Sequence, residues 1–282
     1  MERLRTPAAM RAWADARRAE GARIGLVPTM GYLHEGHVSL VRVAKGAGSE
    51  AVAASIFVNP TQFGPGEDFE KYPRDEGRDL AMLDAAGVDA VYLPGVRDMY
   101  PEGHQTFVEV TGVSQGLCGA VRPGHFRGVA TVVAKLVLAA KPHVAVFGEK
   151  DYQQLAVIRA MNRDLDFGIE IVGAPIVREE DGLAKSSRNV YLKGDDRIAA
   201  RCLSRGLFRA KELFDAGERD AGTLVAAAGA AIEGEPRAKL EYAEGRDPVT
   251  LTPLSGRVDA VTILVAAKVG PVRLIDNITL GN

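Results

Sequence analysis

Two histidines three residues apart stand in the segment VPTMGYLHEGHVSL at 27–40. We expect a strand to end at Pro28 and a helix to begin near Gly36, so that His34 and His37 project to the same side of the first helical turn. At that place they would lie beside unpaired backbone N–H groups and the positive end of the helix dipole, which together bind phosphate. Taken alone, the pair could equally be structural, or two metal ligands without an obvious third.

A second segment whose residues could take part in chemistry is VFGEKDYQQL at 146–155, where a buried strand is expected to run into a tight turn. A lysine at the carboxyl end of a parallel strand, as Lys150 would be, can neutralise phosphate charge. The acidic residues on either side of it could instead cap the next helix, with Lys150 as a solvated surface residue. Gln153 and Gln154 open that helix, and one of them could face the same crevice.

Two further groups of residues could contact anions. The loop GLAKSSRNVYL at 182–192 offers small hydroxyl donors and the bidentate fork of Arg188, which suits a mobile phosphate clamp. The basic cluster RPGHFR at 122–127 could be a further anion contact. Each of these segments also has the composition of an ordinary exposed loop.

Neutral amides follow another expected strand in SIFVNPTQFG at 55–64. Asn59 and Gln62 are the kind of group that holds a hydroxylated substrate in a defined orientation. The alternative is that they only form the turn around Pro60.

The elements that must position these residues alternate between strand and helix. Strands are predicted at Ile24–Val27, Ala51–Val58, Val88–Leu93, Val144–Phe147 and Ile169–Val172, and helices at 7–20, 37–45, 74–86, 127–140 and 151–164. This alternation is typical of an α/β, Rossmann-like, doubly wound parallel sheet with its ligands at the carboxyl ends of the strands. A helical stretch at 195–231 and strand-like runs near 238–243, 258–266 and 271–275 predict a smaller α+β domain at the C-terminus. We therefore place the two domains at 1–176 and 177–282.

Composition narrows the classes of function. The chain has 282 residues, with 35 Lys and Arg against 37 Asp and Glu for a net charge of -2, and it therefore lacks the positive field of a nucleic-acid-binding protein. Cys118 and Cys202 lie far apart, which argues against a disulfide framework or a structural zinc site and fits a reducing cytosol. The N-terminus has no apolar signal sequence, and no apolar run approaches the roughly 20 residues that span a bilayer. We expect a cytoplasmic protein that acts on small molecules and contacts neither nucleic acid nor membrane.

Five ordered segments together resemble one family. PTMGYLHEGH, SIFVNPTQFGPGEDFEKYPRD, LCGAVRPGHFRGVATVV, VFGEKDYQQL and SSRN are similar to the motifs of the pantothenate synthetases. These are the pantoate:β-alanine ligases of the cytidylyltransferase-like superfamily, which share H-x-G-H with class I aminoacyl-tRNA synthetases. The resemblance implies an N-terminal domain that binds ATP and pantoate, a smaller C-terminal lid domain, Mg-ATP as cosubstrate and a homodimer.

The same resemblance implies roles for individual residues. It assigns catalysis to His34, His37, Lys150 and Arg188, with His37 as proton donor. It assigns pantoate binding to Gln62 and Gln154, with Gln62 also near β-alanine, and we add Asn59 as a substrate contact; no residue is assigned to a protein-bound metal. It assigns ATP binding to Pro28, Met30, Gly31, Tyr32, Leu33, His34, Glu35, Gly36, His37, Gly148, Glu149, Lys150, Asp151, Val177, Lys185, Ser186, Ser187 and Arg188. Lys185 departs from the methionine that is usual in the family.

The activity implied is ATP-dependent ligation of pantoate and β-alanine through a pantoyl-adenylate, in pantothenate and coenzyme A biosynthesis. Two alternatives remain at this stage. A related H-x-G-H nucleotidyltransferase would transfer the nucleotide to a phosphate acceptor, for which the neutral Gln62 and Gln154 are poorly suited. A catalytically silent regulator would bind ATP without exchanging pyrophosphate.

Overall fold

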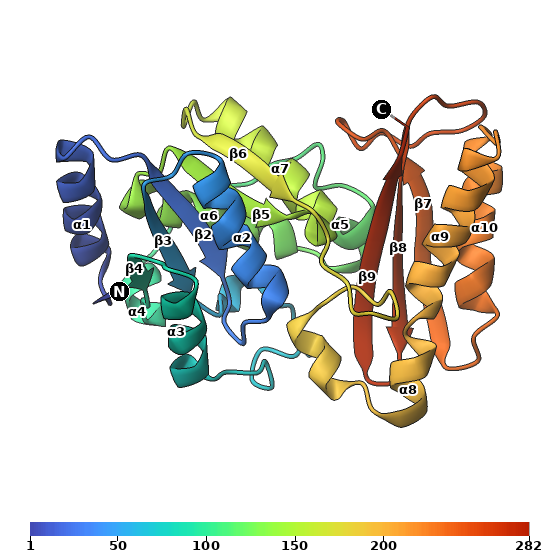
Figure 1. Ribbon diagram of the computed structural model, residues 1–282, viewed down its shortest axis with the longest axis horizontal. Helices are drawn as coiled ribbons and strands as arrows, with labels where there is room; N and C mark the ends of the chain where they lie inside the picture. Colours follow the sequence, from blue (N-terminus) through green and yellow to red (C-terminus); the bar gives the residue numbers. More distant parts are fainter. Residues whose placement is uncertain (282) are drawn as a thin grey trace. The chain divides into compact units, whose positions relative to one another are not determined.

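The computed structural model describes residues 1–281, and the chain divides into two compact units (Figure 1). The first unit contains Met1–Glu149 and Val157–Pro175. The second contains Lys150–Ala156 and the chain from Ile176 onward. The second unit therefore includes residues 150–156, which the sequence pattern placed in the N-terminal domain.

A six-stranded sheet forms the centre of the first unit, in the order β1-β4-β3-β2-β5-β6. Its strands are β1 (Glu2–Leu4), β2 (Ile24–Thr29), β3 (Ala51–Ile56), β4 (Ala90–Tyr92), β5 (Val144–Gly148) and β6 (Glu170–Ala174). All neighbouring strands run parallel, which confirms the α/β, doubly wound class. β1 was not expected, because two of its three residues are charged; it pairs with β4 at the edge of the sheet.

Helices cover both faces of this sheet. The elements of this part of the chain are α1 (Pro7–Ala19), α2 (Glu35–Gly46), η1 (Pro60–Gln62), α3 (Glu76–Ala85), α4 (Val96–Met99), α5 (Leu117–Val121), α6 (His125–Ala140), η2 (Glu149–Asp151) and α7 (Tyr152–Asp164). α2 and α3 share one apolar core with β2, β3 and β4, around residues such as Leu40, Leu83 and Val52. α1 and α6 pack against each other and against β2. Apolar side chains on alternate strand positions can therefore be buried on either face.

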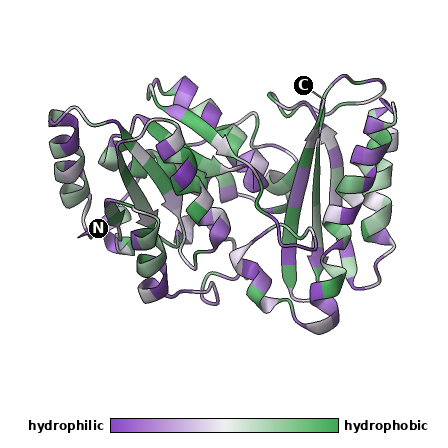
Figure 2. Ribbon diagram, viewed as in Figure 1, coloured by the Kyte–Doolittle hydropathy of each residue, from purple (hydrophilic) through white to green (hydrophobic). Residues whose placement is uncertain are grey.

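The second unit has an antiparallel sheet with helices packed against it. Its elements are η3 (Ser187–Tyr191), α8 (Gly194–Ala199), α9 (Cys202–Asp215), α10 (Ala221–Glu233), β7 (Ala238–Arg246), β8 (Val261–Val269) and β9 (Val272–Leu280). β8 lies between β7 and β9, and its residues 261–267 are all buried. The strands of both sheets are largely hydrophobic, whereas most helices carry mixed faces (Figure 2). The α+β character expected for this part of the chain is confirmed.

The expected strand at 271–275 is longer than predicted, because β9 runs to Leu280. The cause is the pair Asp276 and Asn277, polar residues that are nevertheless buried in the strand. Across residues 1–281, none of the helices has the length and apolar character needed to cross a membrane. Both cysteines are buried as free thiols.

Candidate active site

The turn between β2 and α2 carries the two histidines of the H-x-G-H motif. Its backbone is left-handed at two successive residues, Gly31 (φ 83°) and Tyr32 (φ 48°). This conformation favours glycine at the first position and is uncommon for tyrosine at the second. A Cβ on residue 31 would also lie 3.0 Å from both the Asp79 carboxylate and Ile56. The turn is therefore tight and is packed against α3 and β3.

His34 and His37 cap α2 reciprocally. The His34 Nδ1 accepts from the Gly36 N–H at 3.1 Å, and the His37 Nδ1 accepts from the His34 N–H at 3.2 Å. Since each Nδ1 acts as an acceptor, the neutral imidazoles carry their protons on Nε2. The two rings lie 4.1 Å apart between centroids. The motif thus fixes two imidazoles side by side, each with an N–H donor on Nε2.

The expectation of unpaired backbone N–H groups at this turn is wrong for most of its residues. The Gly31 N–H binds the Thr29 hydroxyl, and the N–H groups of residues 32 and 33 bind Asp79. The N–H groups of residues 34 and 36 bind the histidine rings, and those of residues 37 and 38 bind the His34 carbonyl. Most N–H groups of this turn are therefore already bonded within the protein, whereas the Nε2–H groups of the two histidines are not used in capping α2.

Asp79 on α3 was not singled out from the sequence. It is 1% exposed, and its two carboxylate oxygens accept from the N–H groups of Tyr32 and Leu33, both at 2.7 Å. Burial raises the pKa of Asp79, and the two backbone hydrogen bonds oppose that shift. The guanidinium of the preceding Arg78 lies over the Tyr32 ring at 5.1 Å. The first turn of α3 therefore holds the backbone that leads into His34.

Gln62 and Asn59 lie together at the carboxyl end of β3, in and before η1. The Asn59 Nδ2 donates to the Gln62 Oε1 at 3.0 Å and to the Gly128 carbonyl at 3.1 Å. Its Oδ1 accepts from the Thr61 N–H and hydroxyl at 3.3 and 2.9 Å. Two backbone groups with fixed roles, a carbonyl and an N–H, thus define which atom of the Asn59 amide is oxygen and which is nitrogen.

The orientation of Asn59 in turn defines that of Gln62. Because the Gln62 Oε1 accepts from Asn59, its Nε2 is directed to the other side, where it lies 3.2 Å from the Met30 sulfur. Tyr100 reinforces the arrangement, since its hydroxyl donates to the Asn59 Oδ1 at 2.8 Å and burial raises the pKa of that hydroxyl. Gln62 therefore presents an N–H donor, which matches a carboxylate or hydroxyl oxygen.

Close packing between α6 and η1 makes this network possible. A Cβ on Gly128 would lie 2.3 Å from the Thr61 carbonyl, so only glycine allows α6 to approach. Asn59, predicted as a substrate contact, is 1% exposed and makes all these hydrogen bonds within the protein. Its geometry is that of a residue that orients Gln62.

Arg122, in the basic cluster at 122–127, forms an ion pair with Glu67. Arg122 donates to both carboxylate oxygens of Glu67, at 2.8 and 2.6 Å, and to the Gln62 carbonyl at 3.2 Å. The His125 Nδ1 also donates to the Gln62 carbonyl, at 2.8 Å. Desolvation raises the pKa of Glu67, but the hydrogen bonds and charge of Arg122 outweigh it and lower that pKa overall. The Arg122 guanidinium therefore already binds Glu67 and the Gln62 carbonyl within the protein.

Lys150 belongs to the second unit, where its backbone is attached to the last strand. The Asn277 Nδ2 donates to the Lys150 carbonyl at 3.0 Å. The Lys150 Nζ lies 3.9 Å from the Asp151 carboxylate, and its side chain is 20% exposed. In the same segment, the Tyr152 hydroxyl donates to the Pro248 carbonyl at 2.8 Å. Residues of the C-terminal sheet and its loops therefore position the backbone around the lysine.

The KSSRN loop begins from a short two-stranded turn. The Lys185 N–H donates to the Val177 carbonyl at 2.9 Å, which brings these two predicted ATP contacts together. The Lys185 Nζ lies 3.8 Å from a carboxylate oxygen of Glu179. Ser186 caps η3 by accepting from the Arg188 N–H at 3.3 Å. The lysine that departs from the family pattern therefore has an acidic neighbour in the turn.

A buried ion pair that no sequence motif indicated anchors this turn. Arg178 donates to both oxygens of Asp276 at 2.7 and 3.0 Å, and to the Gly182 carbonyl at 3.1 Å. Asp276 is 3% exposed. Since a buried charge needs a partner, the pair ties the turn to β9.

The remaining predicted residues divide between the two units. Pro28 and Met30 lie at the end of β2, Leu33 and Glu35 follow in the turn and the start of α2, and Gly148 and Glu149 end β5 and begin η2. In the second unit, Gln154 is half-buried on α7, Gln153 is buried, and Ser187 is buried in η3.

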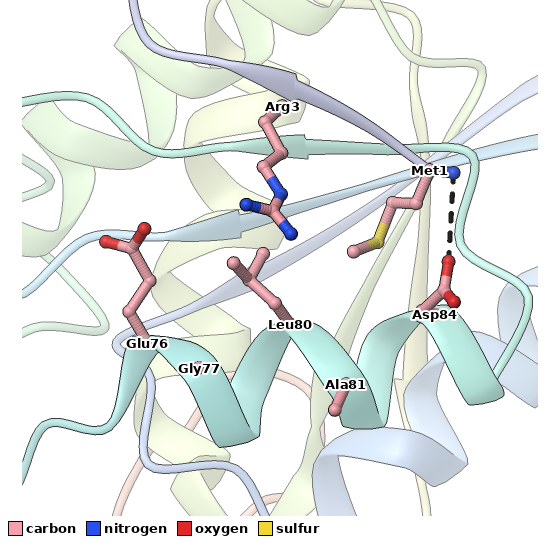
Figure 3. Close-up of a pocket in the computed structure, with 7 residues that line it drawn as sticks. All are labelled: Met1, Arg3, Glu76, Gly77, Leu80, Ala81 and Asp84. Carbon is pink, nitrogen blue, oxygen red and sulfur yellow. Dashed lines mark ion pairs between the residues drawn. The ribbon is translucent and has the colours of Figure 1, made fainter.

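A surface hollow of about 430 Å³ lies elsewhere on the first unit (Figure 3). Residues of β1 and α3 line it, and the N-terminal amine lies 3.7 Å from Asp84 at its rim. None of the predicted site residues contributes to it. Among residues 1–281, no group of three or more His, Cys, Asp or Glu side chains could hold a metal ion.

The fold and the H-x-G-H turn define an α/β protein of the doubly wound class. A family model for pantoate-beta-alanine ligase matches residues 2–279. The pantothenate synthetase of Myxococcus xanthus is 54% identical over 281 residues, covering 99% of this chain and 96% of that protein. The chain belongs to the pantoate-beta-alanine ligase family.

Solved structures agree with this assignment. The pantothenate synthetase of Thermus thermophilus superposes with a TM-score of 0.93 at 48% identity, with 99% of each chain covered. The pantoate-beta-alanine ligase of Francisella tularensis, complexed with beta-gamma ATP and beta-alanine, gives a TM-score of 0.80 at 33% identity. That match covers 99% of this chain and 97% of the other.

Proposed function

We propose that this chain ligates pantoate and β-alanine to pantothenate at the expense of ATP, through a pantoyl-adenylate. A carboxylate cannot be joined to an amine until its oxygen becomes a better leaving group, and transfer of AMP supplies one. A pantoate oxygen attacks the α-phosphorus of ATP and expels pyrophosphate. The β-alanine amine then attacks the acyl carbon and expels AMP. Membership of the family over nearly the whole chain is the observation that carries this proposal.

The first unit contributes the histidine pair and Gln62 to this reaction. The Nε2–H donors of His34 and His37 stabilise charge that develops on the phosphates, and His37 serves as the proton donor. The Gln62 N–H donor orients pantoate through an oxygen of the acid. These roles are supported by the capping hydrogen bonds of the imidazoles and by the amide network around Asn59. Most of the catalysis is then positioning and electrostatic stabilisation.

The second unit contributes cations and a second amide. Lys150 and Arg188 offset phosphate charge, Ser186 and Ser187 offer hydroxyl donors, and Gln154 contacts pantoate. Asp151 and Val177 complete the contacts that this unit makes to the nucleotide. The family resemblance and the position of these residues at element ends support the assignment.

Magnesium enters this proposal as part of Mg-ATP. Mg²⁺ is usually held by one or two carboxylates together with substrate phosphates, so the residues present fit it without a protein cage. Glu149 and Asp151, on either side of Lys150, are the carboxylates that would hold it. When bound, the ion neutralises phosphate charge.

The proposal includes a homodimer and a cytoplasmic location. The homodimer rests on the family resemblance alone, and the cytoplasmic location rests on cysteine usage that fits a reducing cytosol. Sedimentation of the purified protein would test the dimer.

Exchange of labelled pyrophosphate into ATP tests the proposed reaction. Exchange that requires pantoate and proceeds without β-alanine is expected. Exchange without pantoate would favour a different nucleotidyltransferase. ATP binding without any exchange would favour a silent ATP-binding regulator.

A further inference from the structure

We infer that Asp79 is a positioning residue for the reaction, which holds the turn at residues 31–33 so that His34 and His37 face the phosphates. The inference rests on the proposed role of the two histidines. Asp79 itself is buried beneath the turn and is 1% exposed, so it acts through the backbone and not on the substrate.

The turn needs an external support because its conformation is unfavourable. Gly31 and Tyr32 are both left-handed, and a tyrosine rarely adopts that conformation unless its surroundings impose it. Successive N–H groups in such a turn converge on one side and form a cavity that attracts anions. Here the two N–H groups of Tyr32 and Leu33 meet the two oxygens of Asp79, each at 2.7 Å.

Asp79 therefore occupies the anion site that the turn would otherwise offer to a phosphate. Its charge is internal to the protein, and its position is set by α3. The Leu33 peptide leads directly into His34, whose N–H holds the His37 ring. A shift of the turn would consequently move both imidazoles together.

The substitution Asp79→Asn preserves size but replaces one acceptor oxygen by an NH₂ donor. One of the two turn N–H groups then faces another donor, and the turn must move or twist. Misplacement of catalytic groups by about 1 Å can cost a hundredfold in rate. We expect a roughly 10- to 100-fold fall in pantoate-dependent pyrophosphate exchange at saturating ATP, with the thermal unfolding transition still cooperative.

Asp75→Ala is the matched control. Asp75 caps the same helix by accepting from the Arg78 N–H at 3.0 Å, a contact made within α3 and its cap rather than to the turn. Its loss weakens α3 while the two bonds to Asp79 remain. If Asp75→Ala lowered exchange as much as Asp79→Asn at equal loss of stability, Asp79 would be a structural residue only.

Two spectroscopic measurements separate this inference from the proposed reaction. In the unsubstituted protein, the amide protons of Tyr32 and Leu33 should exchange with solvent roughly a hundredfold or more slowly than freely solvated loop amides, because local opening must precede their exchange. If these two amides exchanged at loop rates, the inference would be overturned without any variant. In Asp79→Asn, the imidazole ¹⁵N shifts of His34 and His37 should move. Unchanged shifts and unchanged pyrophosphate exchange in a folded Asp79→Asn protein would also refute it. A folded His37→Ala protein with normal exchange would instead refute the proposed reaction site.

Discussion

Replacing the Nδ2 donor of Asn59 by an oxygen, in Asn59→Asp, should impair the use of pantoate selectively. In Asn59→Asp, the oxygen that accepts from Thr61 and Tyr100 is retained. The Nδ2 donor is replaced by an acceptor, which then faces the Gln62 Oε1 at 3.0 Å and the Gly128 carbonyl at 3.1 Å. The Gln62 amide can relieve its repulsion by rotating, whereas the backbone carbonyl cannot.

Rotation of the Gln62 amide would present an oxygen where a nitrogen now lies. With the role proposed for Gln62, pantoate then loses a hydrogen bond to its carboxylate or hydroxyl oxygen. A hydrogen bond that involves a charged group contributes about 1.5–3 kcal/mol, so kcat/KM for pantoate should fall about ten- to a hundredfold. The unrelieved contact with Gly128 should also lower the free energy of unfolding by about 1–3 kcal/mol.

Pyrophosphate exchange at varied pantoate and at varied ATP measures this effect. The KM for ATP should change little, and the loss should grow with pH, because a protonated carboxyl at residue 59 can still donate to Gln62. Tyr100→Phe is the matched control, since it removes one donor to Asn59 without inverting the amide, and it should alter pantoate use less than about threefold. An Asn59→Asp protein that is folded and uses pantoate normally would refute the deduced orientation of Gln62.

Three further outcomes are expected. His37→Ala should slow pyrophosphate exchange roughly a hundredfold or more in a folded protein, because it removes a donor to the phosphates; normal exchange would exclude that role. Lys185→Met should reduce exchange less than about tenfold at both low and high salt, because Glu179 already balances the ammonium charge; a larger loss at both would make Lys185 a catalytic residue. Because the pKa of Glu67 is lowered in the folded state, its bond to Arg122 stabilises the protein above the ordinary glutamate pKa of 4.5, and that contribution is lost as pH falls through the lower folded value. The protection factors of the amide protons at residues 64–72, which correct for the slower intrinsic exchange in acid, should therefore decrease as pH falls, and unchanged protection factors would contradict the role of the pair.

Local sequence patterns predicted the strands that carry apolar runs, such as β2 and β5, together with the helices between them. They did not predict β1, which contains two charged residues and pairs with β4 at the edge of the sheet. Spacing alone also placed the H-x-G-H histidines at the start of α2. Spacing could not predict which acceptor binds the backbone N–H groups of Tyr32 and Leu33, because that acceptor, Asp79, lies 47 residues from Tyr32 in the chain.

The same limit explains the other residues that the sequence did not reveal. Asp276 and Asn277 interrupt an apolar strand pattern, and their burial makes sense only with distant partners, Arg178 at 98 positions and Lys150 at 127. Tyr100 reaches Asn59 across 41 positions. Long-range contacts between polar groups leave no periodic trace in a single sequence, whereas apolar strands and helix starts do.

The hydrogen bond between Asn277 and the Lys150 carbonyl has a consequence for the order in which the protein is made. Lys150 leaves the ribosome early, but its partner emerges only with the last strand, β9. The first unit, by contrast, has all its residues once Pro175 has been synthesised. A nascent or prematurely terminated chain can therefore complete the histidine turn but cannot fix the lysine. With the role proposed for Lys150, we expect chains that stop before β9 to be inactive.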